Sequence, residues 1–262
     1  MVHLKRRDVA AIKSRRGENM SLAVIMPLVA PPYAPGAANK LLSKIEPREV
    51  FLRAVELYAQ RDQYTERVLV APPDVLGDLQ KYSANLGFQG VALTGGTSDW
   101  LGCVARGLEK LTPAIEQVVV HDPARVSVPF FLLDALEAAL TDNPKAAGAV
   151  PVLLTNAAFA EVEKQVGDFV DMTAVSEIQS PQIFRRKILA EAHAKRAADK
   201  SSFMDDAELV TSIGGKIVTV PGSRFNQRVD SDEMVRIAKH LIETMPKPKP
   251  KTPLNPFGEA QW

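Results

Sequence analysis

Short apolar runs alternate with amphipathic segments through the middle of this chain, and this alternation restricts the fold more than any other feature. The runs are typical of buried parallel strands and cover residues 22–26, 67–71, 90–93, 117–121 and 147–153. The segments between them carry apolar side chains at helical spacing and cover residues 47–60, 73–86, 101–111 and 128–140. Such an alternation predicts an α/β fold with a doubly wound sheet and right-handed crossovers.

The alternation is interrupted at residues 155–178, where no clean period appears. A connection of this length is usually functional or an interaction element. Beyond it, the pattern predicts helices over residues 181–197, 205–212 and 231–244 and a strand over residues 216–220. We therefore expect one α/β domain over residues 21–244, with an arm at about residues 155–178.

The two ends of the chain differ in composition from this domain. Residues 1–20 are rich in Lys and Arg, which is compatible with an anion-binding arm, but a loosely ordered extension is the commoner case. Met20 is an alternative natural start. Residues 245–262 alternate Pro with Lys, a composition that builds no core and predicts an extended tail.

The overall charge gives no reason to expect nucleic acid or a membrane as partner, because 32 basic residues balance 31 acidic ones. The most apolar stretch, residues 22–38, is interrupted by prolines and predicts no membrane span. The single cysteine, Cys103, lies in an apolar helical segment, which indicates a buried structural thiol and a reducing compartment. We expect a cytoplasmic protein.

No metal-binding pattern appears in the sequence. The four histidines, which are His3, His121, His193 and His240, are scattered and have no ligand spacing. No phosphate-binding loop of the G-x-x-x-x-G-K-[ST] type is present either. The sequence therefore predicts no resident metal site made by the protein alone.

The segment from His121 to Arg125 reads His-Asp-Pro-Ala-Arg and directly follows the apolar run that ends at Val120. Open α/β sheets bind ligands at the carboxyl ends of their strands, so Asp122 and Arg125 are candidate ligand-binding residues. A surface ion pair at the end of a strand is an equally good interpretation of these two residues taken alone.

Further fragments occur in a fixed order around this segment. They are Gly95-Gly96 before a helix, Pro151-Val152 with Thr155, Gln179-Ser180-Pro181-Gln182-Ile183-Phe184, Asp205-Asp206-Ala207-Glu208-Leu209-Val210 and Asn226-Gln227-Arg228. In this order and spacing the chain resembles the 2-C-methyl-D-erythritol 4-phosphate cytidylyltransferase family over roughly residues 22–244.

The resemblance implies a Rossmann-like nucleotidyltransferase fold with a protruding arm through which the family dimerises. It implies transfer of CMP from CTP to a sugar-alcohol phosphate, with Mg²⁺ as cofactor. The implied catalytic residues are Lys40 and Arg228, and the implied substrate-binding residues are Asp122, Arg125 and Thr155. The implied nucleotide-binding residues are Gly95, Gly96, Pro123 and Ser180.

The first loop departs from the family pattern. Where the family has a Gly-rich loop with an Arg, this chain has Pro31 and Pro32, which supply no N–H donors, and Ala34 near the position of the Arg. Polar family positions are also changed, to Cys103, Met172 and Met204, and Arg16 or Arg106 are candidate replacement cations.

Two functions thus remain open from the sequence. The first is an active cytidylyltransferase, and the second is a catalytically impaired homologue that binds a nucleotide or a protein partner without transfer. Transfer of another nucleotide to an unrelated phosphate is a third possibility, because nothing in the sequence identifies the base.

Overall fold

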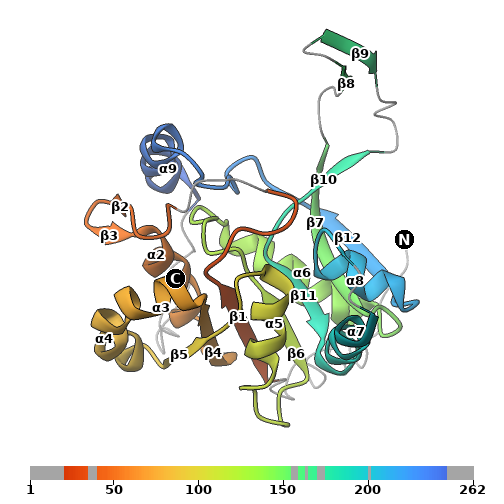
Figure 1. The fold of residues 1–262 in the computed structure, drawn as a ribbon, viewed down its shortest axis with the longest axis horizontal. Coiled ribbons are helices and arrows are strands. Elements are labelled where there is room, and N and C mark those ends of the chain that lie inside the picture. Colours follow the sequence, from red (N-terminus) through yellow and green to blue (C-terminus); the bar gives the residue numbers. More distant parts are fainter. Residues whose placement is uncertain are drawn as a thin grey trace, which may run out of the picture.

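The computed structural model describes residues 21–34, 40–154, 159–162, 165–169, 175–199 and 202–246. The strands of its main sheet are β1 (Leu22–Pro27), β4 (Tyr64–Ala71), β5 (Val91–Gly95), β6 (Gln117–Val120), β7 (Gly148–Leu154), β10 (Ser176–Ile178), β11 (Gln182–Arg185) and β12 (Ile217–Pro221). The order across the sheet is β10-β7-β11-β6-β1-β4-β5, with β12 paired to β7 (Figure 1).

The topology produces a switch point beside β1. From β1 the chain moves outward to β4 and β5 on one side, and then returns to place β6 on the other side; all of these pairs are parallel. Open α/β sheets bind ligands where the strand order reverses in this way. The crevice beyond the carboxyl ends of β1 and β6 is therefore the expected ligand site.

Helices cover both faces of this sheet, which confirms the doubly wound arrangement (Figure 1). Alternate residues of β1 enter two separate cores: Val24 and Met26 pack with α2 (Val50–Ala59) and α6 (Phe130–Asp142), whereas Ile25 packs with α5 (Trp100–Leu108). This period of two is what a strand buried on both faces requires. The remaining helices are α3 (Pro73–Leu79), α4 (Ser83–Phe88), α7 (Arg186–Asp199), α8 (Asp206–Ser212) and α9 (Asp232–Thr244).

The predicted arm contains two strands of its own. β8 (Phe159–Val162) and β9 (Gln165–Phe169) form an antiparallel pair that stands away from the main sheet in Figure 1. β10 then returns along β7 in antiparallel orientation. The arm therefore protrudes, as expected, although its strands were not predicted. Thr155 and Met172 lie outside the described residues.

Three predicted helices were wrong in extent. Residues 182–185 form β11, which is antiparallel to β6 and β7 and lies between them, because Ile183 and Phe184 are buried in the cores on opposite faces of the sheet. Residues 73–86 form α3, a 3-10 turn (Gln80–Tyr82) and the start of α4 in place of one helix. The first predicted helix starts at Val50, after the short strands β2 (Lys44–Ile45) and β3 (Arg48–Glu49).

A buried polar group ties three helices together. The carboxylate of Asp206 accepts hydrogen bonds from Trp100 Nε1 and His193 Nε2, both at 2.8 Å. Beside it, Asp205 accepts from the backbone N–H of Glu208 at the start of α8 and from Gln182 Nε2. The acidic pair of the sequence motif is therefore structural, since it fixes α8 against α5, α7 and β11.

None of the described helices is long and apolar enough to cross a membrane.

Candidate functional site

The end of β6 places Asp122 at the switch point. The N–H of His121 still bonds to the carbonyl of Ile25 in β1, and the chain then turns so that the N–H of Asp122 donates to Ser180 Oγ at 2.7 Å. Asp122 Oδ1 accepts from the N–H of Ala124 at 3.0 Å. Asp122 is 1% exposed, so its carboxylate is held in one orientation below the surface.

Arg228 pairs with this carboxylate although it is 106 residues further along the chain. Its Nε atom donates to Asp122 Oδ2 at 2.8 Å, and its side chain is 11% exposed. Its Nη1 atom is buried and has no hydrogen-bond partner among the described residues. The pair places a fixed positive charge with a free N–H donor at the carboxyl edge of the sheet.

Arg125 brings a second guanidinium to the same place. Its Nη1 donates to the carbonyl of Asn226 at 2.6 Å, and its Nη2 lies 3.6 Å from Glu177 Oε1. Asn226 Nδ2 in turn donates to the carbonyl of Ser180 at 2.8 Å. This network joins the loop after β6, the link between β10 and β11, and the segment after β12. We call Asp122, Arg125 and Arg228 the charged cluster.

His121 is a neutral, buried side chain that holds the loop of the charged cluster in place. Its Nε2–H donates to the carbonyl of Arg125 at 3.1 Å, so its Nδ1 is left to accept from the Tyr58 hydroxyl at 2.9 Å. Complete burial lowers the pKa of His121 from 6.5 to about 4. The histidine of the motif therefore orients the loop and does not face the crevice.

This burial predicts a loss of stability in weak acid. In the unfolded chain His121 takes up a proton below about pH 6.5, whereas in the folded protein it does so only near pH 4. The unfolded state thus binds more protons between these values, and we expect the free energy of unfolding to fall by about 3 kcal/mol from pH 6.5 to pH 4 through this group. Urea titrations at several pH values measure the slope.

The variant His121→Gln is the matched control for this prediction. Its amide can donate to the Arg125 carbonyl and accept from Tyr58, but it does not titrate. We expect a flatter dependence of the unfolding free energy on pH between 6.5 and 4. Identical slopes for the variant and the unchanged protein would contradict the assignment.

The loop after β1 carries Tyr33 into the neighbourhood of the charged cluster. A turn closes this loop, because the N–H of Ala34 donates to the carbonyl of Pro31 at 2.9 Å. The Tyr33 hydroxyl lies within electrostatic range of Asp122, Arg125 and Arg228. Burial and, next, the Asp122 charge raise the pKa of Tyr33 well above its usual value, so the phenol is neutral.

Two pockets flank this loop. One, of about 430 Å³, lies at the ends of β1 and β4 and is lined by Leu28, Val29, Ala30, Pro72, Pro73, Asp74, Val75 and Ser98. The other, of about 940 Å³, lies beside β7, β10, β12 and α8; its wall includes Tyr33, Val150, Glu177, Met204 and Thr219. Asp122, Arg125 and Arg228 line neither pocket, but Glu177, which lies beside Arg125, is part of the wall of the larger one.

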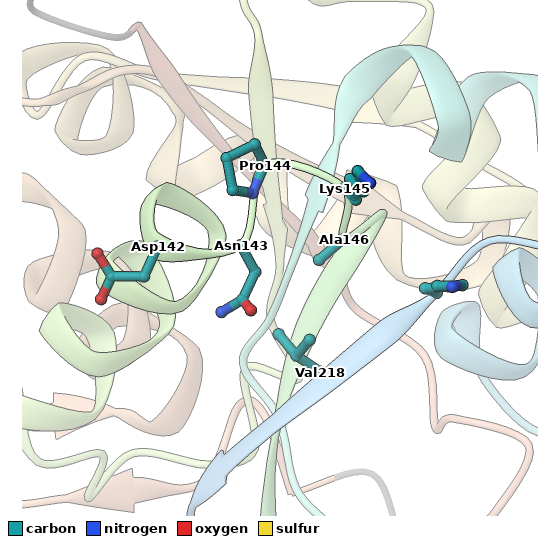
Figure 2. Close-up of a pocket in the computed structure, with 7 residues that line it drawn as sticks. Asp142, Asn143, Pro144, Lys145, Ala146 and Val218 are labelled. Carbon is teal, nitrogen blue, oxygen red and sulfur yellow. The ribbon is translucent and has the colours of Figure 1, made fainter.

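A further pocket lies at the opposite edge of the sheet. Figure 2 shows this space of about 340 Å³, which is lined by Asp142, Asn143, Pro144, Lys145, Ala146, Lys216 and Val218. These residues precede β7 and β12 or lie near the start of β12, so the pocket is at the amino ends of the strands, away from the switch point. None of its described lining residues carries a buried polar atom without a partner.

The structure places the other predicted residues in different settings. Lys40 Nζ pairs with Asp232 Oδ1 at 2.9 Å, beside the first turn of α9. Gly95 is the last residue of β5, and the N–H of Gly96 donates to the carbonyl of Ala71 at the end of β4. Both glycines therefore lie on the side of the sheet that carries the 430 Å³ pocket. A side chain at Gly96 would collide with Val70 and Cys103.

Pro123 and Ser180 are both buried within the loop network. The Ser180 hydroxyl is used to accept from the N–H of Asp122, so it acts by holding that residue. Cys103 is buried and donates to the Thr97 carbonyl, which confirms the structural thiol. Arg106, in the last turn of α5, forms an exposed pair with Glu109, the residue after the helix. Arg16 lies outside the described residues.

Sequence reasoning missed Tyr33, Glu177 and the buried amide of Asn226 as members of the site. Tyr33 had one signal, because it is the only aromatic residue in the loop after the first strand. Glu177 had none, since its contact with Arg125 depends on how β10 returns along β7. The role of Asn226 follows from its two-residue spacing to Arg228 only once the fold is known.

The described residues do not form a cage for the implied Mg²⁺. They contain no group of three or more His, Cys, Asp or Glu side chains that could hold a metal ion. Both oxygens of Asp122 already accept hydrogen bonds, from Ala124 and from Arg228. Mg²⁺ is commonly bound through one or two carboxylates together with substrate phosphates. The fit to a protein-only site is therefore poor.

Comparisons with known proteins identify the family. The model of the IspD family, 2-C-methyl-D-erythritol 4-phosphate cytidylyltransferase, matches residues 34–244. The enzyme of that name from Streptomyces avermitilis is 32% identical over 200 residues, which are 72% of this chain and 77% of that protein. The one from Salinibacter ruber is 25% identical over 224 residues, which are 85% and 93% of the two chains.

Two solved structures share the fold. The structure from Thermus thermophilus has a TM-score of 0.67 and 25% identity, and covers 84% of this chain and 98% of its own. The 4-diphosphocytidyl-2C-methyl-D-erythritol synthase from Anaerococcus prevotii has a TM-score of 0.72 at 19% identity, covers 86% and 100%, and supports the fold alone. This chain belongs to the 2-C-methyl-D-erythritol 4-phosphate cytidylyltransferase family.

Proposed function

We propose that this protein transfers the cytidylyl group of CTP to 2-C-methyl-D-erythritol 4-phosphate. The observation that carries the proposal is the charged cluster of buried Asp122, Arg125 and Arg228 at the switch point of the sheet. The family's curated relatives carry this activity in their names. Two guanidinium groups held by buried partners suit a reaction between two phosphate-bearing substrates.

The reaction is an in-line displacement at phosphorus. An oxygen of the acceptor phosphate attacks the α-phosphorus of CTP, a new P–O bond forms, and the bond to the bridging oxygen breaks so that pyrophosphate leaves. Positioning and charge stabilisation supply most of the catalysis in such reactions. Mg²⁺, when bound by the phosphates, would supply further neutralisation of their charge.

Arg228 is the residue that we assign to charge stabilisation, because Asp122 fixes its Nε and leaves Nη1 for a phosphate oxygen. Arg125 would bind the acceptor phosphate from the other side of the cluster. Lys40 would first have to leave Asp232, which is 78% exposed, and surface pairs of this kind contribute little to stability. Gly95 and Gly96 would border the nucleotide, and Thr155 of the arm would contact the acceptor.

Pyrophosphate release tests the function directly. We expect pyrophosphate release only when CTP, 2-C-methyl-D-erythritol 4-phosphate and Mg²⁺ are all present. Calorimetric titration should show that CTP binds over the same range of CTP concentrations in which the rate of release rises. Binding of CTP without release would favour the impaired homologue, whereas neither binding nor release would refute the proposal. Parallel reactions with ATP, GTP and UTP identify the base.

We further propose a homodimer formed through the arm in the cytoplasm. The β8–β9 hairpin stands away from the sheet, and exposed apolar side chains lie at its base, namely Leu154, Val175, Ile178 and Met204. Exposed apolar groups gathered in one place are typical of an interface.

We expect light scattering to give the mass of a dimer for the intact chain. Deletion of residues 159–167, with a short Gly-Ser connection, should give a monomer because it removes the paired strands of the hairpin. The substitution Phe131→Ser, at an apolar residue that is 53% exposed on α6, is the control and should stay dimeric. A monomeric intact chain would refute the assembly.

A further inference from the structure

The two cations proposed for the nucleotide phosphates are held by carboxylates in opposite settings. Arg228 Nε donates to Asp122, whose side chain is 1% exposed. Lys40 Nζ donates to Asp232 Oδ1 at 2.9 Å, but the side chain of Asp232 is 78% exposed. A buried pair is costly to break, whereas an exposed pair is weak. Arg228 is therefore a fixed charge, and Lys40 is a charge that can change its partner.

One short segment of the chain connects the two pairs. Asp232 follows Arg228 by four residues, which span at most about 14 Å even when fully extended. The N–H of Val229 donates to the carbonyl of Ala124, so this segment is fixed to the loop after β6. The ammonium of Lys40 lies at one end of the segment and the guanidinium of Arg228 at the other. Two cations placed in this way suit an anion with several phosphate groups.

Only the side chain of Lys40 has to move for it to change partner. The carbonyl of Lys40 accepts from the N–H of Ser43 at 2.9 Å, and the next residue, Leu41, is buried in the core. α9 lies against β2 in Figure 1, and Lys239 of α9 pairs with Glu46, the residue after β2, at 2.9 Å. The backbone around Lys40 is therefore anchored, while its ammonium is carried on a flexible side chain.

Asp232 remains stabilised after Lys40 has left it. Asp232 lies in the first turn of α9, which is capped by Ser231, and a carboxylate is favourable at the amino end of a helix. The bond to Lys40 and, to a smaller extent, the charge of Arg236 lower the pKa of Asp232. Arg236 is one turn further along the same helix and stays beside the carboxylate. The release of Lys40 therefore leaves no isolated charge behind.

We propose that Asp232 is a positioning residue that keeps Lys40 engaged in the protein without substrate and releases it to the triphosphate of CTP. The inference rests on the proposed function in taking Lys40 to be a cation for the nucleotide. The exchange replaces one charge-assisted hydrogen bond by another. The apparent affinity for CTP is lowered in proportion to the fraction of molecules in which Lys40 is still paired.

Calorimetric titration with CTP in the presence of Mg²⁺ tests the inference without any transfer reaction. We expect Asp232→Asn to bind CTP about 3- to 5-fold more tightly than the unchanged protein, because Lys40 is then free before CTP arrives. Asp232→Glu keeps the pair and should stay within about twofold. Glu46→Gln is the matched control, because it removes a carboxylate from the other ion pair of α9 and should also stay within about twofold.

A double-variant cycle shows whether the effect acts through Lys40. We expect Lys40→Met to weaken CTP binding by about tenfold, the usual effect of losing a hydrogen bond to a charged group. In that background Asp232→Asn should give no further gain, because the carboxylate has no ammonium left to hold. A general effect of the lost negative charge on an anionic ligand would give the same gain in both backgrounds.

Steady-state kinetics give a readout that a structural role would not change in the same way. In Asp232→Asn we expect the KM for CTP to fall by the factor seen in the titration. The kcat and the KM for the acceptor should stay within about twofold of their original values. A purely structural role would change these constants together or lower the thermal midpoint.

CTP binding that is unchanged or weaker in Asp232→Asn would overturn the inference, as would an equal gain in the Lys40→Met background. Absence of CTP binding in all of these proteins would refute both the inference and the proposed function. If CTP binding follows the expected order but no pyrophosphate is released, then the proposed function fails and the inference stands. If pyrophosphate is released but Asp232→Asn changes neither CTP binding nor its KM, then the inference fails alone.

Discussion

Replacement of Arg228 by Ala is expected to lower the rate of cytidylyl transfer by about 10²–10³, the usual cost of losing one preorganised charge-stabilising donor. The same change leaves the buried Asp122 carboxylate without its cation, because Arg228 Nε is its charged partner at 2.8 Å. Removal of one partner of a buried ion pair typically costs about 3–5 kcal/mol of stability. We therefore expect both the rate and the free energy of unfolding to fall.

A double variant separates the two effects. In Asp122→Ala with Arg228→Ala, no buried charge of the pair remains, so most of the stability should return, whereas the rate should stay low. Arg228→Lys keeps the charge but not the geometry of the guanidinium, and should lie between the extremes. Denaturant titrations and pyrophosphate release on the same preparations measure the two quantities.

Arg106→Ala is the matched control, because Arg106 forms an exposed pair with Glu109 at the other end of α5. Its rate and stability should remain close to those of the unchanged protein, as is usual for surface pairs. An Arg228→Ala protein with a rate within about tenfold of the original would exclude Arg228 from the chemistry. If stability alone falls, the pair with Asp122 is only structural.

The sheet could be predicted from the sequence because its central strands are buried on both faces. β1 and β6 consist almost entirely of apolar residues, and such runs are visible without any knowledge of the partner strands. β11 could not be found in this way. Its four residues merge directly into α7, and its direction is set by the return of the chain from the arm.

The site could be predicted only as separate residues. The position of Asp122 after an apolar run indicated a ligand site, but its partner Arg228 follows β12 and meets it through the topology of the sheet. Sequence spacing carries no information on such a contact. The alternative of a surface ion pair is wrong, since Asp122 is 1% exposed and Arg125 is 5% exposed.

The roles of the motif histidine and acidic pair could not be predicted either. His121, Asp205 and Asp206 look like chemical groups in the sequence, yet each is buried and bonded within the protein. One motif can contain a polar residue that only holds the site loop in place and another that faces the site. Burial distinguishes them, and burial depends on the packing of elements distant in the chain.

The second large effect concerns the loop after β1, because residues 28–34, the described part of the loop that directly follows β1, offer few backbone donors for a triphosphate. Pro31 and Pro32 have no N–H. The N–H of Leu28 already donates to Val70, and that of Ala34 donates to Pro31. This leaves the N–H groups of Val29, Ala30 and Tyr33 to approach phosphate oxygens among the described residues of the loop.

We therefore expect CTP-dependent transfer to be slower, by about 10²–10³, than in a family member that has the Gly-rich loop with its Arg. The variant Pro31→Gly/Pro32→Gly/Ala34→Arg restores two donors and a positive charge, and should recover part of this difference in kcat/KM for CTP. Pro144→Gly, in the pocket at the far edge of the sheet, is the control and should leave kcat/KM unchanged.

Two other outcomes of the loop experiment would show that groups outside this loop set the rate of transfer. A turnover equal to that of the Gly-rich relative would show that another cation neutralises the leaving pyrophosphate, and Lys40→Ala tests whether that cation is Lys40. If the restored loop gives no gain, the limiting contacts lie on the acceptor side. There, Met204 is 52% exposed on the wall of the larger pocket and supplies no hydrogen-bond donor from its side chain.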